Sequence, residues 1–358
     1  MYQGKSKMAK RKKSGIKKVL AVVAVILVIG GITAGYFAYR TAFGPNVDLE
    51  GKVTMHIYIP TGSSYEDVLN ILEENRVVAN INTFTWLAEQ KNYPNRVMAG
   101  RYLIHEDMNN NELINLLRSG RQDPVNITFS NIHTRYEVAG VLSRRLEADS
   151  AGILDLMKDP EVMKNYGLTP ETAKLMFIPN TYEFLWNTSE KEVLDRMQRE
   201  YNNFWNNQRL RQAENINLSP EEVGIMASIV QRETSKRDEM NRIAGVYMNR
   251  IKRNIPLQAD PTVIFAVGDM SINRVLNRHL EIDSPYNTYR NRGLPPGPIT
   301  LPEPFVIDQV LNYENHEYLF FCALDDFSGY HAFAKTYNEH LANARRYRQA
   351  LNERRIMR

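Results

Sequence analysis

Hydrophobic positions along the chain predict a membrane-spanning segment followed by folded parts. Residues 19–39 form an uncharged run of 21 residues. At about 1.5 Å per residue, a helix of this length crosses a bilayer. The run ends in aromatics, Tyr36, Phe37 and Tyr39, which suit the membrane interface and favour an uncleaved anchor over a cleaved signal peptide. Residues 40–50 are expected to be a linker between this anchor and the folded body.

The chain after residue 50 begins with a pattern typical of a small α+β module. Hydrophobic residues alternate from Val53 to Ile59, as in a half-buried strand, and Ser64 with Asp67 forms the capping box of a helix. Further stripes predict a second helix, a second strand and a third helix that ends at Gly120. This order over residues 51–122 resembles that of LysM-type sugar-binding modules, and a packing or spacer domain is the alternative.

A second alternating pattern begins at Val125 and is followed by helices rich in Leu, Met and Tyr. It predicts a larger mixed α/β domain over residues 123–345, followed by a basic helix end or tail at 346–358. The expected fold class is therefore α+β, with a single N-terminal transmembrane helix, a small LysM-like module and this larger domain.

The distribution of charge gives the orientation of the span. Of the 45 basic residues, nine lie in residues 1–40, where no acidic residue occurs, and this leaves 36 basic against 41 acidic residues elsewhere. A basic nucleic-acid-binding face on the folded body is therefore not expected. The basic cluster places residues 1–18 in the cytoplasm and the body outside it, in a single-pass protein of the cell membrane.

Several kinds of chemistry lack their usual motifs. The single cysteine, Cys322, excludes a disulfide framework and cysteine-rich metal sites. GxSxG, Walker, GxGxxG and HExxH motifs are also absent from the sequence. No metal and no organic cofactor is expected.

One carboxylate stands on the apolar face of a sharply defined helix. Ser219 to Glu222 provides an N-cap, a proline at N1 and a capping box. Glu233 follows Val230 by three residues and so shares the buried stripe. In a cleft, its pKa would be raised to the range that a general acid needs near neutral pH. The alternative is that Glu233 ends the helix in a salt bridge to Lys236 or Arg237.

Two segments stiffened by proline follow, at residues 256–268 and 284–302. Aromatic rings offer flat faces to the C–H face of a sugar, and amides and hydroxyls match its polar groups. The second segment combines such side chains with prolines that would hold them in place before a ligand arrives. In the first segment, Asp260 before Pro261 is alternatively a helix N-cap.

Five segments carry a family resemblance: FIPNTYEF (177–184), ASIVQRET (227–234), NRI with LQADPTV (249–251 and 257–263), YNTYRNRGLPPGPI (286–299) and HAFAKTYNEH (331–340). In this order they resemble the motifs of the YceG-like family of endolytic murein transglycosylases, membrane-anchored bacterial enzymes that cut peptidoglycan glycan strands. That family usually has two glutamates in the second segment, of which the second is catalytic. Here Gln231 replaces the first, and the resemblance gives the catalytic role to Glu233. Asn180 replaces an expected acidic residue, which puts a charge role there in doubt.

The resemblance implies a lytic reaction in the larger, catalytic domain. Glu233 would protonate the glycosidic oxygen between N-acetylmuramic acid and N-acetylglucosamine in nascent strands, and then accept the proton of the attacking C6 hydroxyl. The product would be a 1,6-anhydro end that terminates strand elongation, and peptidoglycan synthases are candidate partners. The candidates for holding the saccharides are Gln258, Asp260, Tyr286, Asn287 and Tyr289.

Two rival functions stay open at this point. One is a non-catalytic, anchored peptidoglycan-binding or cell-wall assembly scaffold, in which Glu233 is structural. The other is a two-carboxylate hydrolase with Glu183 or Asp260 as the partner of Glu233, which would leave reducing ends.

Overall fold

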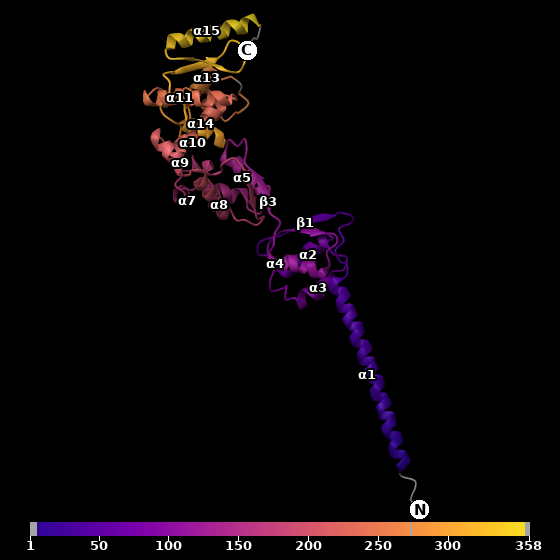
Figure 1. Ribbon diagram of the computed structural model, residues 1–358. Helices are drawn as coiled ribbons and strands as arrows, with labels where there is room; N and C mark the ends of the chain where they lie inside the picture. Colours follow the sequence, from indigo (N-terminus) through magenta and orange to yellow (C-terminus); the bar gives the residue numbers. More distant parts are fainter. Residues whose placement is uncertain (1–5, 273, 355–358) are drawn as a thin grey trace, which may run out of the picture. The chain divides into compact units, whose positions relative to one another are not determined.

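The computed structural model describes residues 6–272 and 274–354, so the first five residues of the expected basic segment and the last four of the expected basic tail lie outside the described residues. The chain forms two compact units (Figure 1). Unit 1 runs to Pro124 and includes Leu185–Asn187, and unit 2 holds Val125–Phe184 and the chain from Thr188 onward. Helices and short antiparallel strands occur in both, which confirms the mixed α+β class.

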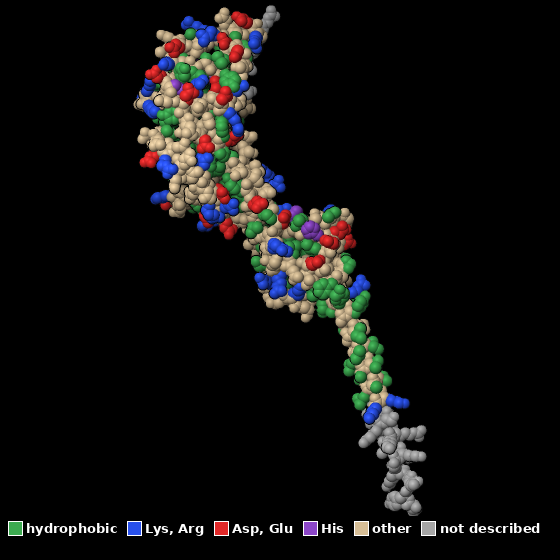
Figure 2. Space-filling model, viewed as in Figure 1, with side chains coloured by type: hydrophobic (Ala, Val, Ile, Leu, Met, Phe, Trp, Pro, Cys, Tyr) green, Lys and Arg blue, Asp and Glu red, His purple; other side chains and the backbone are tan. Residues whose placement is uncertain are grey.

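Unit 1 begins with one long helix, α1 (Ser6–Phe43). Within the described residues, its Lys17–Phe43 part is the one helical stretch long and apolar enough to cross a membrane. Exposed hydrophobic side chains are spread along this stretch from Val19 onward (Figure 2). The end of α1 is tied to the rest of the unit, because the Asn110 side-chain amide donates to the carbonyl of Thr41 at 2.9 Å.

The small module has the predicted order of elements. These are β1 (Thr54–Ile59), α2 (Tyr65–Glu74), α3 (Ile81–Gln90), β2 (Gly100–His105) and α4 (Asn110–Ser119). β1 and β2 pair antiparallel, with Ile57 opposite Tyr102. The Ser64–Asp67 capping box is present, and Gly120 ends α4 in the left-handed conformation that glycine adopts without strain.

Residues 40–50 are not the linker that the sequence predicts. Helix α1 continues to Phe43, and the next residues pack into the core of unit 1, where Val47 and Leu49 are buried. Val47 also forms an antiparallel bridge with Val78. Burial of these two side chains removes apolar surface from water, and this outweighs the turn-forming composition of the segment.

Unit 2 is mainly helical, with two antiparallel strand pairs. Its first half holds β3 (Val125–Thr128), α5 (Arg135–Ser143), α6 (Ser150–Lys158), α7 (Pro160–Asn165), the 3₁₀ helix η1 (Ala173–Met176), β4 (Thr181–Phe184), α8 (Glu190–Phe204) and α9 (Asn207–Asn215). Its second half holds α10 (Pro220–Glu233), η2 (Arg237–Glu239), α11 (Met240–Lys252), α12 (Asp260–Val267), α13 (Asn277–Leu280), α14 (Pro304–Leu311), β5 (Phe320–Ala323), β6 (His331–Ala334) and α15 (Tyr337–Glu353). β3 pairs with β4, and β5 pairs with β6.

Helix α15 packs on the β5–β6 pair, and its last turns are residues 346–353 of the expected basic tail. Residues 346–353 of that tail are therefore helical, and Arg354 caps the helix.

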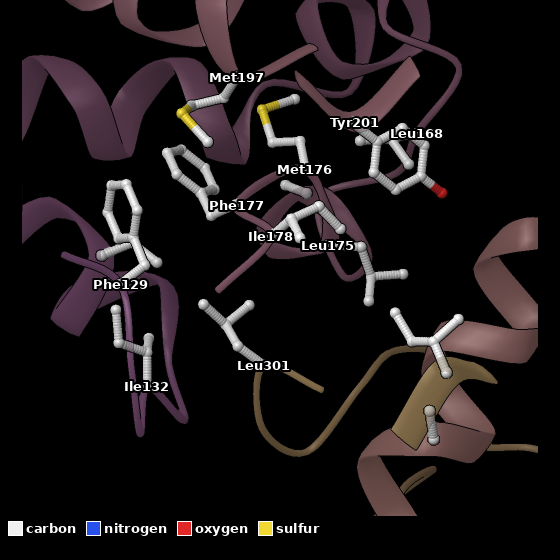
Figure 3. Close-up of a cluster of buried hydrophobic side chains, with 14 of the residues drawn as sticks. Phe129, Ile132, Leu168, Leu175, Met176, Phe177, Ile178, Met197, Tyr201 and Leu301 are labelled. Atoms are coloured by element: carbon white, nitrogen blue, oxygen red, sulfur yellow. The ribbon is translucent and has the colours of Figure 1, made fainter. Parts of the chain in front are cut away.

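The core of unit 2 joins the first strand pair to helix α10. Figure 3 shows Phe129 and Phe177 facing each other, with ring centroids 5.2 Å apart and an interplanar angle of 63°. Helix α10 buries its predicted stripe in the same core and packs against α9, α11, α12 and α14. Gly224 lies so close to η1 that an added Cβ would come within 2.8 Å of Leu175. Helix α10 is thus fixed on several sides, and it carries Glu233 at its end.

Replacement of Phe177 by alanine should destabilise unit 2 by about 3–5 kcal/mol, because the ring is fully buried and leaves a cavity. Denaturant unfolding of the full-length protein, followed by fluorescence, measures this change. The control is Leu210→Ala on α9, at a side chain that is 42% exposed, which should change the free energy of unfolding by no more than about 0.5 kcal/mol. Equal effects of the two substitutions would contradict the packing described here.

Candidate active site

Glu233 is the last residue of α10, whose start has the predicted capping box between Ser219 and Glu222. Its carboxylate accepts a hydrogen bond from the hydroxyl of Tyr247 on α11. The alternative salt bridges are not formed. Arg237 pairs with Glu303 at 3.0 Å, and the Lys236 ammonium lies 4.6 Å from the centre of the Tyr330 ring. Glu233 therefore faces α11 rather than the basic residues that follow it in the chain.

Burial of the carboxyl group raises the pKa of Glu233 to about 7. The hydrogen bond from Tyr247 opposes this rise, the negative charge of Asp260 adds to it, and the positive charge of Arg250 opposes it. Near neutral pH the protonated and ionised forms of Glu233 are thus both populated. A group in this range can both donate and accept a proton at little cost.

Tyr247 and Arg250 are buried residues of α11 to which the sequence assigned no role. The Tyr247 ring packs edge-on against Phe321 of β5, with centroids 6.0 Å apart, and this contact fixes the hydroxyl that bonds Glu233. Arg250 donates to the carbonyls of Leu319, Pro256 and Leu257 at 2.7–3.0 Å. A signal for both residues was present in the sequence. Tyr247 and Arg250 lie three residues apart, which places them on the same face of a helix, and Arg250 is part of the NRI motif.

The two proline-containing segments are joined beside this pair of helices. Gln258 has a positive φ of 53° and donates its backbone N–H to the carbonyl of Thr288 at 3.1 Å. The Gln258 side-chain oxygen accepts from Arg250 at 3.2 Å. Thr288 also accepts from the N–H of Ala259 at 3.0 Å. A left-handed backbone is unfavourable for glutamine, and these hydrogen bonds hold it there.

Asp260 is the first residue of α12 and not its N-cap, which is Ala259. The alternative interpretation of Asp260 as an N-cap is therefore wrong. The Asp260 carboxylate accepts a hydrogen bond of 2.5 Å from the hydroxyl of Tyr289 in the second segment. Its negative charge raises the pKa of both Tyr289 and Glu233, although burial is the larger cause for each.

Two predicted saccharide-binding residues lie outside this cluster of polar groups. Asn287 is fully buried, and its amide donates to the carbonyls of Leu280 and Ile282, both at 2.9 Å. Its side-chain oxygen accepts from the N–H of Tyr289 at 3.1 Å. Tyr286 packs against Phe265 of α12, with ring centroids 4.8 Å apart. The structure thus groups Glu233 with Gln258, Asp260 and Tyr289, while Asn287 closes the loop and Tyr286 turns to another surface.

The two departures from the family motifs both make backbone contacts. The Gln231 amide donates to the carbonyl of Leu301 at 3.2 Å, and its oxygen accepts from the N–H of Glu303 at 2.6 Å. The Asn180 side chain accepts from the N–H of Thr181 at 2.8 Å. Glu183, the other possible partner carboxylate, is an exposed residue of β4 opposite Asn126.

Fold and site together define a helical domain in which one partly buried glutamate is suited to proton transfer. A family model described as the YceG-like family matches residues 57–346, and the chain belongs to this family.

Two curated relatives of this chain are both named endolytic murein transglycosylase. The endolytic murein transglycosylase of Bacillus subtilis strain 168 is 28% identical over 338 residues, covering 90% of this chain and 92% of the relative. That of Streptococcus pneumoniae serotype 2 is 26% identical, covering 84% of this chain and 60% of the relative. A crystal structure of a putative YceG-like protein from Listeria monocytogenes matches with a TM-score of 0.53 and 28% identity, covering 82% of this chain and 99% of that one.

Replacement of Tyr247 by phenylalanine should raise the pKa of Glu233 above about 7, because the hydroxyl stabilises the carboxylate and the ring alone does not. The titration of the Glu233 side-chain carbon, followed by NMR and assigned by its loss in Glu233→Gln, measures this shift. Tyr313→Phe on the surface beside Lys252 is a control that should leave the titration unchanged. A downward shift in Tyr247→Phe would contradict the assigned hydrogen bond.

Proposed function

We propose that this chain is an endolytic lytic transglycosylase that cleaves the bond between N-acetylmuramic acid and N-acetylglucosamine within nascent peptidoglycan strands. The observation that carries the proposal is the single glutamate, Glu233, whose pKa lies near 7 and whose carboxylate is aligned by Tyr247. Family membership and the names of the curated relatives support the same reaction.

The proposed reaction uses one carboxyl group twice. Protonated Glu233 gives its proton to the glycosidic oxygen as the bond from that oxygen to the anomeric carbon breaks. The C6 hydroxyl of the same muramic acid attacks the anomeric carbon, and its proton passes to the Glu233 carboxylate. The glutamate is restored, no water is consumed, and a 1,6-anhydro end remains, which stops elongation of the strand.

The polar groups around Glu233 have separate roles in this proposal. Tyr247 holds the carboxylate, and Arg250 holds the loop that presents Gln258. Asp260 and Tyr289 form a hydrogen-bonded pair whose negative charge stabilises the cationic transition state. Saccharide binding is proposed for Gln258, Asp260 and Tyr289, and support of the loop for Asn287.

The proposal places α1 across the cell membrane as an uncleaved anchor, with its N-terminus in the cytoplasm and both units outside. The bond from Asn110 to the carbonyl of Thr41 supports retention, because the end of this helix belongs to the fold of unit 1. Binding of glycan by the LysM-like module and association with peptidoglycan synthases extend the same proposal.

A two-carboxylate hydrolase is the second candidate function. It is favoured by one observation, the proximity of Asp260, whose charge raises the pKa of Glu233. In that reaction Asp260 would activate water, and reducing ends would replace anhydro ends.

Glu233→Gln should reduce the cleavage of uncross-linked glycan strands by about 10²–10⁴-fold, because the amide can neither donate nor accept the proton. Mass spectrometry of the products measures this loss, with Glu183→Gln on the exposed side of β4 as the matched control. A folded Glu233→Gln protein with unchanged cleavage would exclude the proposed role. Binding without cleavage by the wild-type protein would favour the scaffold.

Asp260→Asn separates the two reactions by their products. The lytic proposal expects slower cleavage with the same 1,6-anhydro ends, because the C6 hydroxyl remains the nucleophile. Loss of reducing-end products with this variant, after their formation by the wild-type protein, would establish the hydrolase instead.

A further inference from the structure

A pocket of unit 2, outside the Glu233 cluster, combines basic and aromatic side chains. It has a volume of about 140 Å³ and is lined by Thr134, Arg135, Tyr136, Pro170, Glu171, Lys174, Phe265 and Tyr286. Since a water molecule occupies roughly 30 Å³, the pocket has room for a small charged group with a few attached atoms. We call it the Lys174 pocket.

Lys174 is the unusual member of this pocket. The residue is only 5% exposed, and lysines are seldom buried without a carboxylate partner. Its ammonium donates to the carbonyl of His133 at 2.5 Å and lies 4.9 Å from the centre of the Phe265 ring. An ammonium has three donors, so this carbonyl leaves donor capacity for a ligand.

The charges around Lys174 do not neutralise it by direct pairing. Among the described residues, neither Lys174 nor Arg135 has a carboxylate within ion-pair distance, and Arg135 donates to the carbonyl of Pro170 at 3.2 Å. The Glu137 carboxylate instead accepts from the N–H of His133 at 2.8 Å, and Glu171 is exposed. Burial lowers the pKa of Lys174 to about 7, so an anion bound beside it would restore its charge.

The aromatic wall of the pocket is held in place by close packing. Tyr286 packs on Phe265, and an added Cβ at Gly297 would come within 2.9 Å of the Tyr286 hydroxyl. The same Cβ would come within 2.4 Å of the Glu171 carbonyl. Gly297 thus lets the loop backbone approach Glu171 and the Tyr286 ring more closely than a residue with a Cβ could.

The pocket and the Glu233 cluster share two elements. Asp260 and Phe265 both lie on α12, about 7.5 Å apart along the helix axis for five residues. Tyr286 and Tyr289 belong to the same loop. The two sites therefore belong to the same helix and the same loop, with Asp260 and Phe265 on different sides of α12.

We infer that the Lys174 pocket binds a carboxylate carried by the muramic acid substituents of a glycan strand, with Lys174 and Arg135 as its donors. The inference rests on the proposed function for the identity of the ligand. Such a carboxylate is found either on the peptide stem or, where the stem has been removed, on the lactyl group itself. Phe265 and Tyr286 would contact the apolar atoms next to it.

The test measures KM and kcat of the full-length protein in detergent micelles on uncross-linked strands. Lys174→Met and Arg135→Gln should each raise KM about tenfold to a hundredfold, the value of one charge-assisted hydrogen bond, with little change in kcat. Lys191→Met, at an exposed lysine that pairs with Asp195, is the matched control and should leave KM unchanged. Thermal unfolding identifies a variant that fails to fold, and the two variants remove different donors.

Chemically altered strands distinguish carboxylate recognition from a structural role. Conversion of the stem carboxylates to methyl amides should raise the wild-type KM and abolish the difference between wild type and variants if the stem is the ligand. Strands stripped of their peptides expose the lactyl carboxylate, and they should show a difference in KM between wild type and variants if the pocket takes that carboxylate. A difference that persists on amidated strands, or no change of KM in either variant on both intact and stripped strands, would overturn the inference.

A direct measurement of strand binding tests the Lys174 pocket independently of the proposed cleavage reaction. The Kd of the same three strand preparations is measured by calorimetry in the Glu233→Gln background, with and without Lys174→Met. A wild-type protein that cuts no strands but binds them in a manner dependent on Lys174 and on carboxylates would refute the proposed reaction and support the pocket. Binding that is indifferent to both would refute the pocket alone.

Discussion

The site depends on the removal of one carboxyl group from water at the junction of two helices. Glu233 ends α10, and the hydroxyl of Tyr247 on α11 reaches it, so the packing of these helices determines both the burial of the carboxyl group and its alignment. Burial alone would favour the neutral form of Glu233. The hydrogen bond from Tyr247 stabilises the ionised form and so offsets part of the effect of burial. The balance gives a group that changes its protonation near neutrality. The core of unit 2 supports this balance because the buried side chains of α10 and α11 pack in it together.

The loops beside the two helices are organised by hydrogen bonds from buried residues rather than by regular structure. Arg250 reaches three carbonyls from α11, and Thr288 connects the two proline-containing segments. Asn287 donates its side-chain amide to the carbonyls of Leu280 and Ile282, so it joins its segment to the end of α13. These hydrogen bonds hold the segment that carries Asp260 in place, although the Asp260 side chain itself is exposed. Preorganisation of this kind reduces the entropy lost when a ligand binds.

Patterns within a few residues of the sequence predicted much of this architecture. Contacts between residues far apart in the sequence could not be predicted from it. The capping boxes at Ser64 and Ser219 correctly marked helix starts, since the side chains that form them lie within three residues of each other. The prediction of a linker at residues 40–50 was wrong. Its two buried apolar residues, Val47 and Leu49, are too few to form a hydrophobic pattern with a helical or strand period. Glu233 could be found from its helix face and the family motif. Tyr247 could not, because its partner lies on another helix, and Tyr286 was grouped with Tyr289 although neighbouring loop residues point in different directions.

The glutamine that departs from the family motif has a consequence for the site as a whole. Gln231 bridges the end of α10 to the start of α14, since its amide donates to one backbone carbonyl and accepts from one backbone N–H. An ionised glutamate could accept but not donate, so a glutamate there would make both bonds only while protonated. With glutamine, this brace has the same strength at every pH. Glu233 can therefore gain and lose its proton without loosening the neighbouring support.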